Sequence, residues 1–78
     1  MSLINLWSRK QDRQQLFESL LAPYIEHLYK LAYRFRGNQA DAEDLVQDLL
    51  IKLYPRTQEM AGIENLKPWL DKILYHLF

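Results

Sequence analysis

The sequence predicts an all-α fold, a small bundle of three to four helices. Apolar residues recur at steps of three and four along most of the chain, the spacing that gives a helix one apolar face. No stretch alternates apolar and polar residues with the period of two that a strand shows. The two glycines and three prolines fall between these apolar patterns, so they mark helix ends rather than long loops.

The first two predicted helices meet at Pro23. The first runs from about Asp12 to Ala22, and Pro23 ends or kinks it because proline lacks an N–H and clashes with the preceding turn. Proline is also favoured in the first turn of a helix, so Pro23 can equally begin the second helix. Gly37 is a favourable residue just past a C-terminus, and we expect the second helix to end there. The apolar faces of the two helices contain Leu16, Phe17, Leu20, Leu21, Tyr24, Leu28, Leu31, Ala32 and Phe35.

The third predicted helix runs from about Gln39 to Tyr54. Asn38 lies where an N-cap belongs, and Asp41 follows three residues later, a weak variant of the capping box. Pro55 ends the helix because the residue before a proline avoids helical angles. The residues expected to face the core are Ala42, Leu45, Val46, Leu49 and Leu53.

The segment Arg56–Glu64 is predicted to be the one real loop. The last helix follows it, with Asn65 as the expected cap and Pro68 in the first turn, where its missing N–H is harmless. We divide the chain into an N-terminal extension, residues 1–12, and a helical domain, residues 13–78. The apolar face of the last helix contains Leu66, Trp69, Leu70, Ile73 and Leu77.

Composition excludes several classes of protein. There is no cysteine, hence no disulfide framework and no thiolate metal site. No apolar run approaches the roughly 20 residues of a membrane span, and the N-terminus lacks the order of a signal peptide. We therefore expect a cytoplasmic protein without a membrane partner. The net charge of zero argues against a free-standing nucleic-acid binder, but it allows a domain that reaches DNA through a larger partner.

Neither a catalytic nor a metal site is expected. The two histidines, His27 and His76, each lie in the pattern of an ordinary helix-surface residue, and no spacing suggests a catalytic triad. The chain has no Glu-x-x-His pair of a helical di-iron site and no glycine-rich loop for phosphate. We expect a protein that is not an enzyme and needs no cofactor.

The outer faces of the third and the last predicted helix each allow two interpretations. Asp44, Gln47 and Asp48 are neighbours on the outer face of the third helix. They form either a solvated face near the positive end of the helix dipole or a docking patch for a basic partner. On the last helix, Trp69 and Lys72 belong to an aromatic and basic face with Tyr75 and His76. That face is either the rim of the core or a surface that stacks on bases and neutralises phosphates.

Three segments in this order resemble a known family. They are Leu-Tyr-Lys-Leu-Ala-Tyr-Arg-Phe at 28–35, Ala-Asp-Ala-Glu-Asp-Leu-Val-Gln-Asp at 40–48, and Trp-Leu-Asp-Lys-Ile at 69–73. Together they resemble region two of bacterial sigma factors of the extracytoplasmic-function group. The resemblance covers about residues 16–77, and the acidic run at 40–48 is its most specific part. It implies a transcription initiation factor whose partners are the RNA polymerase core and promoter DNA, and it allows an anti-sigma factor as a further partner.

The resemblance assigns the two faces. It implies that Asp44, Gln47 and Asp48 dock on the clamp helices of the polymerase β′ subunit. It also implies that the loop at 56–67 holds a flipped-out base of the minus-ten element and that the following helix lies along the upstream duplex. The residues expected to contact DNA are Arg56, Trp69, Lys72 and His76.

The chain departs from the family after Ile73. The family usually continues Ile-Ala-Arg-Asn, whereas this chain has Leu74, Tyr75 and His76. The arginine and asparagine that would meet DNA are thus replaced, and we expect the domain alone to bind DNA weakly. An alternative is therefore a helical interaction module that titrates polymerase or an anti-sigma factor without recognising DNA. The family's linker and helix-turn-helix domain are not in this sequence, which fits both a domain of a longer protein and a reduced relative.

Overall fold

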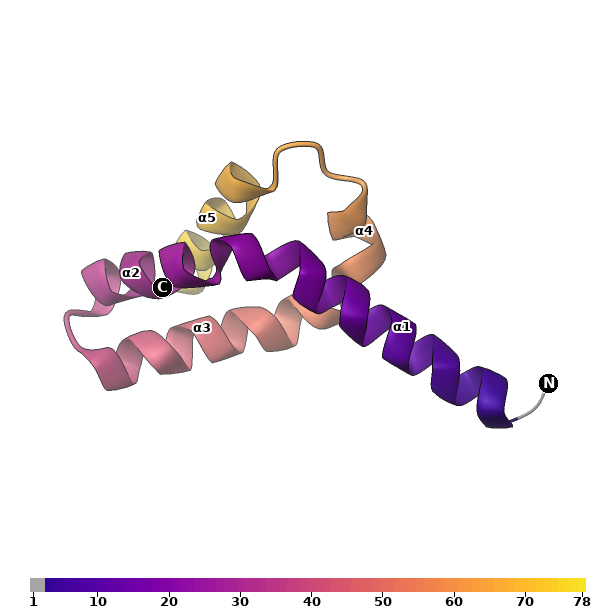
Figure 1. The fold of residues 1–78 in the computed structure, drawn as a ribbon. Helices are drawn as coiled ribbons and strands as arrows, with labels where there is room; N and C mark the ends of the chain where they lie inside the picture. The colour runs from indigo at the N-terminus through magenta and orange to yellow at the C-terminus, as the bar shows by residue number, and fades with distance from the viewer. Residues whose placement is uncertain (1–2) are drawn as a thin grey trace.

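Five α-helices form the part of the chain that is described. The computed structural model describes the backbone of residues 3–78 and the side chains of residues 12–78. No strand occurs in this part, which confirms the predicted all-α class (Figure 1). The predicted helices correspond to α1, α2, α3 and α5, and α4 is an addition. The elements are α1 (Leu3–Leu21), a 3₁₀ turn (Ala22–Tyr24), α2 (Ile25–Arg36), α3 (Gln39–Leu53), a second 3₁₀ turn (Tyr54–Arg56), α4 (Thr57–Ala61) and α5 (Leu66–Leu77).

The C-terminal part of α1 packs on the bundle, and its N-terminal part extends away from it (Figure 1). Phe17 and Leu21 are buried there, as their spacing predicted. Pro23 lies in the 3₁₀ turn between α1 and α2, where its missing N–H breaks no helical bond. The division between residues 12 and 13 falls within α1 and stays a prediction. Residues 1 and 2, and the side chains before residue 12, lie outside the described part of the chain.

The turn between α2 and α3 has the predicted chemistry. Gly37 has φ +83°, the left-handed region that glycine adopts most easily, and its N–H donates to the Tyr33 carbonyl at 2.7 Å. The Asp41 N–H donates to Asn38 Oδ1 at 2.8 Å, which caps α3. Asn38 Nδ2 also donates to Asp41 Oδ2 at 2.8 Å. These bonds fix α2 and α3 as a hairpin of adjacent helices, the pair with the most extensive packing in the fold.

The predicted loop Arg56–Glu64 is wrong over most of its length. The α3 helix ends at Leu53, but the chain continues through a 3₁₀ turn into α4, and the non-helical residues are 62–65. Pro55 lies in the first turn of the 3₁₀ segment, where no N–H is needed. The Thr57 hydroxyl donates to the Tyr54 carbonyl at 2.6 Å, and Met60 is fully buried. Burial of Met60 thus stabilises a short helix where the sequence predicted a loop.

The core lies between α2, α3 and α5, with α1 and α4 closing one end (Figure 1). All five inward residues predicted for α3 are buried. On α5 the buried stripe is rotated from the predicted one, because Leu74 is buried while Leu77 is half-buried. Asn65 is at the N-cap position of α5, but its side chain makes no capping hydrogen bond, contrary to the prediction. The buried apolar residues are Phe17, Leu21, Leu28, Ala32, Ala42, Leu45, Val46, Leu49, Leu53, Met60, Leu66, Leu70 and Leu74.

Candidate binding surfaces

The outer face of α3 is acidic and exposed. Asp44, Gln47 and Asp48 are all exposed, as predicted, because Leu45 and Leu49 point into the core. Among residues 12–78, no lysine, arginine or histidine forms an ion pair with either aspartate. Two carboxylates one helical turn apart repel each other by a few tenths of a kcal/mol. A cationic partner would relieve this repulsion.

An apolar residue that the sequence analysis missed completes this face. Ile51 follows Asp44 by seven positions, Gln47 by four and Asp48 by three, so it shares their side of the helix. Its side chain is 70% exposed, more than any other large apolar side chain of the described residues. Its spacing from the three polar residues is the signal that could have identified it. We call Asp44, Gln47, Asp48 and Ile51 the α3 acidic face.

The second surface is on α5. Trp69, Lys72 and His76 are separated by three and four positions, so they share one side of the helix. Trp69 is half-buried against the core, as predicted, while Lys72 and His76 are exposed. Tyr75, which the sequence placed on the same face, contacts the His76 ring, with centroids 6.1 Å apart, and also reaches α2. Its ring makes an edge contact with Phe35 of α2, with centroids 5.8 Å apart.

Arg56 lies beside this surface but already has a partner. Its guanidinium is 4.9 Å from the centroid of the Trp69 ring, within cation–π range. It also donates two hydrogen bonds of 2.8 Å to the Glu59 carboxylate. The hydrogen bond from Arg56, with a smaller coulombic contribution, lowers the pKa of Glu59 below its ordinary value. The contribution of this ion pair to the stability of the fold is therefore fully present above the ordinary pKa of Glu59. It is lost only as pH falls through the lowered pKa of Glu59 in the folded chain.

Freeing Arg56 should strengthen binding to single-stranded DNA. Glu59→Gln removes the charge that holds the guanidinium and leaves an amide of equal size. We expect tighter binding to a minus-ten oligonucleotide at low salt, with a log–log salt slope steeper by about 0.7, the value for one more phosphate contact on a single strand. Fluorescence anisotropy across a salt series measures this slope. The control is Glu18→Gln, the same change at an exposed position of α1, where no basic side chain of residues 12–78 pairs with the carboxylate. Equal slopes for both variants would show that Arg56 does not reach phosphate.

A contact between α2 and α5 corrects the interpretation of His27. The ring Nε2 of His27 lies 2.7 Å from Asp71 Oδ1, a contact of two partly buried side chains separated by 44 positions in the chain. A carboxylate oxygen accepts, so the ring N–H is the donor. The bond joins α5 to α2. His27 is therefore a tertiary contact and not an ordinary helix-surface residue, whereas His76 is exposed as predicted.

Removing this bond should cost measurable stability. We expect His27→Ala to lower the free energy of unfolding by about 1 kcal/mol, the net value of one side-chain hydrogen bond. The matched control is His76→Ala on the exposed side of α5, which should stay within about 0.5 kcal/mol of the parent chain. Urea unfolding followed by circular dichroism measures both. Equal midpoints for the two variants would mean that the bond does not hold α5.

Other types of site find no support within the described residues. No three of their histidine, aspartate or glutamate side chains come close enough together to hold a metal ion. None of their helices combines the length and the apolar character that crossing a membrane requires.

Comparisons with known proteins point to one family. Residues 20–78 match the family described as sigma-70 region 2. The ECF RNA polymerase sigma factor SigE of Mycolicibacterium smegmatis is 34% identical over 67 residues, covering 80% of this chain and 24% of that protein. The ECF RNA polymerase sigma factor SigG of Mycobacterium tuberculosis is 36% identical over 62 residues, covering 80% and 17%. The RNA polymerase sigma factor SigV of Bacillus subtilis is 30% identical over 66 residues, covering 85% and 40%.

The chain thus spans well under half the length of each of these relatives. No solved structure matches it significantly. The matched segment begins near the end of α1 and includes both surfaces described above.

Proposed function

We propose that this chain, which belongs to the sigma-70 region 2 family, docks on RNA polymerase and contacts the minus-ten element of promoters. The observation that carries the proposal is the α3 acidic face, which lies within the matched residues and has no cationic partner among residues 12–78. A sigma factor works with the cytoplasmic polymerase, so we place the protein in the cytoplasm.

The chemistry of the α3 acidic face suits a basic helix such as those of the β′ clamp. Protein interfaces commonly combine an apolar centre with a polar rim. Ile51 supplies an exposed apolar group, and Asp44 and Asp48 supply charge beside it. Complementary charge speeds association and sets orientation, while apolar burial slows dissociation. Docking therefore needs no change in the fold of α3, because these side chains already point outward.

The α5 surface supplies the proposed DNA contacts. Trp69 offers a partly exposed ring for stacking, and Lys72 offers a charge for phosphate on the same side of the helix. Arg56 lies at the ring and would reach DNA after release from Glu59. Extruding a base costs a few kcal/mol, and the chain has no net charge to attract DNA by itself. Polymerase would supply most of the phosphate neutralisation, so DNA contact follows docking.

A second candidate function lacks the DNA step. In it the domain titrates polymerase or an anti-sigma factor without reading a promoter. The observation that favours it is Tyr75, which stands where the family resemblance expects arginine and has its ring against Phe35. The same α3 acidic face would serve both functions.

One experiment separates the two. The full chain is mixed with core polymerase, and then with a forked DNA that has a single-stranded minus-ten element. The first function predicts a stable complex with polymerase and a ternary complex that is lost when the minus-ten bases are scrambled. The second predicts the same polymerase complex with no dependence on those bases. No complex with polymerase would contradict both.

A further inference from the structure

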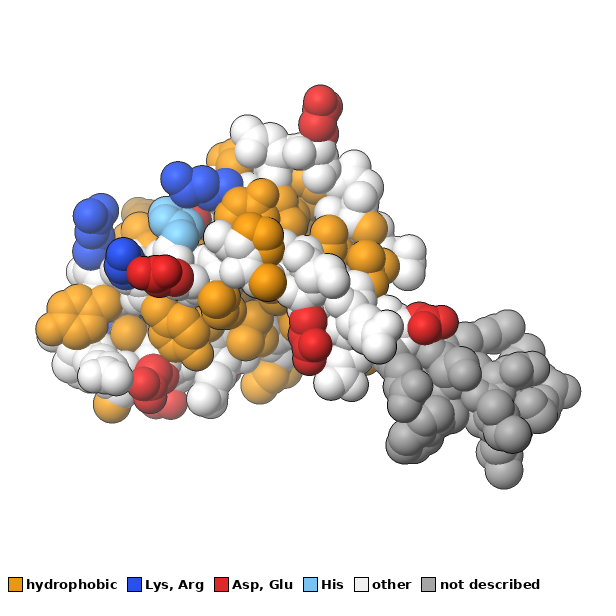
Figure 2. All heavy atoms as spheres, viewed as in Figure 1, with side chains coloured by type: hydrophobic (Ala, Val, Ile, Leu, Met, Phe, Trp, Pro, Cys, Tyr) orange, Lys and Arg blue, Asp and Glu red, His pale blue; other side chains and the backbone are white. Residues whose placement is uncertain are grey.

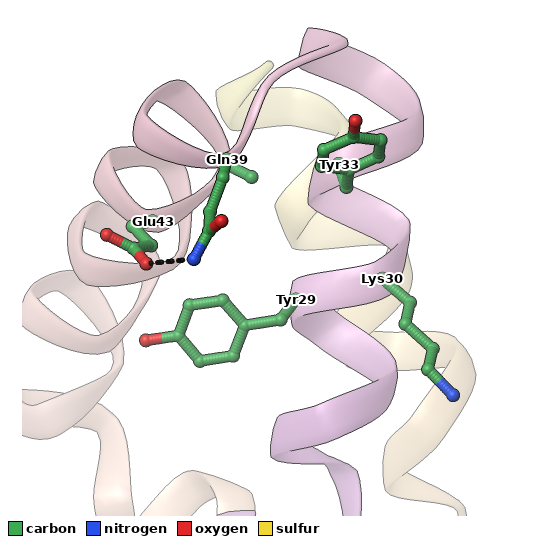
Figure 3. Close-up of a pocket in the computed structure, with 6 residues that line it drawn as sticks. Tyr29, Lys30, Tyr33, Gln39 and Glu43 are labelled. Carbon is green, nitrogen blue, oxygen red and sulfur yellow. Dashed lines mark hydrogen bonds between the residues drawn. The ribbon is translucent and has the colours of Figure 1, made fainter.

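A pocket opens between α2 and α3, beside the α3 acidic face. It has a volume of about 270 Å³. Figure 3 shows Tyr29 pointing from α2 toward α3, with Gln39 and Glu43 opposite it. The side chains that line the pocket are Tyr29, Lys30, Tyr33, Gln39, Ala42 and Glu43.

The lining combines aromatic rings with a carboxylate. Tyr29 and Tyr33 are 36% and 52% exposed, so their rings are open to a ligand. Ala42 is buried on the α3 side of the pocket, and its small side chain leaves the space that the pocket occupies. A tyrosine face attracts cations, most often a guanidinium, which can also stack flat on the ring. A carboxylate beside such a ring completes a site for a positively charged side chain.

Glu43 carries charge that nothing in the described chain compensates. Gln39 Nε2 donates a hydrogen bond of 3.1 Å to Glu43 Oε1, but the amide is neutral. Within the described residues, 12–78, no basic side chain forms an ion pair with Glu43. Lys30 lines the pocket with its stem, yet its ammonium points away (Figure 3) and pairs with Glu26 at 3.1 Å. The carboxylate therefore keeps free acceptor positions for an incoming donor.

The surroundings favour a basic partner that also contacts the α3 acidic face. Glu43 and Gln47 are one helical turn apart, so the pocket and that face are adjacent. On the side of the molecule shown in Figure 2, hydrophobic side chains gather over the α2–α3 hairpin, with carboxylates and also lysine and arginine side chains around them. The carboxylates of Glu43, Asp44 and Asp48 on α3 attract a positively charged partner toward the pocket.

We propose that this pocket receives an arginine side chain from the same polymerase helix that docks on the α3 acidic face. The guanidinium stacks on Tyr29 and donates to the Glu43 carboxylate, with Tyr33 closing the outer side. Arginine fits better than lysine, because a planar fork can stack and donate at the same time. This inference rests on the proposed docking function and adds α2 to the docking surface.

Binding to a β′ fragment that contains the clamp helices tests the pocket. We expect Glu43→Gln and Tyr29→Leu each to weaken binding about fivefold, the effect of roughly 1 kcal/mol for one partly desolvated cation–π or charge contact. The matched controls are Glu64→Gln and Tyr75→Leu, the same changes at exposed positions away from the pocket. Both controls should bind as the parent chain does. Circular dichroism verifies that every variant is folded. If Tyr29→Leu does not fold, Glu43→Gln alone still decides the test.

A double-mutant cycle identifies the partner residue. Each arginine of the fragment is changed to lysine in turn and combined with Glu43→Gln. For one arginine, the change to lysine should clearly lower the binding affinity. Combined with Glu43→Gln, the two losses of binding free energy should no longer add. If the parent chain binds and Asp48→Lys does not, yet the two pocket variants bind like their controls, the pocket is overturned and the docking function stands. Equal coupling for every arginine likewise overturns the pocket. Failure of the parent chain to bind overturns both the pocket and the docking function.

Discussion

Changing Asp48 to lysine should abolish binding to the β′ clamp helices and leave the domain folded. Asp48 is exposed on α3, away from the buried residues Leu45 and Leu49. In the proposed complex it faces a basic helix, and a like charge placed across an interface costs several kcal/mol. We therefore expect the affinity to fall by about 100-fold or more, since each 1.4 kcal/mol is a factor of ten.

The stability of the variant should stay close to that of the parent chain. Asp44 and Asp48 repel each other at a spacing of four, whereas an acid four positions before a lysine attracts it. The substitution thus makes the pair with Asp44 attractive, but it also places a lysine four positions before Lys52, where the like charges repel. These two changes offset each other, and we expect the free energy of unfolding to stay within about 0.5 kcal/mol of the parent value. Loss of binding together with unchanged or raised stability separates docking from folding. A solvated face without a partner would show the same unchanged stability and no loss of binding.

The matched control is Asp12→Lys. Asp12 is exposed on α1, outside the α3 acidic face, and its substitution changes the net charge by the same amount. Isothermal titration with the β′ fragment compares the two variants, and urea unfolding gives their stabilities. If Asp12→Lys weakens binding as strongly as Asp48→Lys, the effect is one of net charge. In that case the docking patch is not where we place it.

The α3 helix shows how much of the fold local pattern predicts. Its boundaries follow from Asn38 and Pro55, whose effects on the backbone are confined to neighbouring residues. Its inward residues follow from spacing alone, because a helix with one apolar stripe has one way to bury it. The exposure of Asp44 and Asp48 is the complement of that stripe. The acidic part of the candidate docking surface was therefore predictable residue by residue.

The α4 helix shows where local pattern is insufficient. Pro55 is compatible with both a loop and the first turn of a new helix, and the choice depends on what Met60 packs against. That information lies in the core contacts with α1, which are distant in sequence. The bond between His27 and Asp71 is distant in the same way, since it spans two helices whose relative placement no spacing rule gives. Ile51 is a different case, because its spacing from Asp44 and Asp48 was visible in the sequence. An exposed apolar residue is common on any protein surface, however, so this spacing alone did not mark Ile51 as part of a binding site.

Cutting Leu49 back to alanine should leave the domain largely unfolded. Leu49 is fully buried in the middle of α3, where the α2 and α5 helices pack on that helix. Truncating a buried leucine typically costs about 2–5 kcal/mol, from lost transfer free energy and the cavity left behind. A domain of this size without a metal or disulfide has a total stability of about 3–5 kcal/mol. The loss is therefore comparable with the whole free energy of unfolding.

Ile51→Ala is the control for this effect, two positions further along the same helix. Its side chain is 70% exposed, so its removal opens no cavity and should change stability by no more than about 0.5 kcal/mol. Alanine also has the higher helix propensity, which offsets the small apolar loss. We expect helical ellipticity at 25 °C to be retained by Ile51→Ala and mostly lost by Leu49→Ala. Similar melting curves for Leu49→Ala and Ile51→Ala would contradict the packing of α3. They would mean that the buried and the exposed side of this helix contribute equally to the stability of the domain.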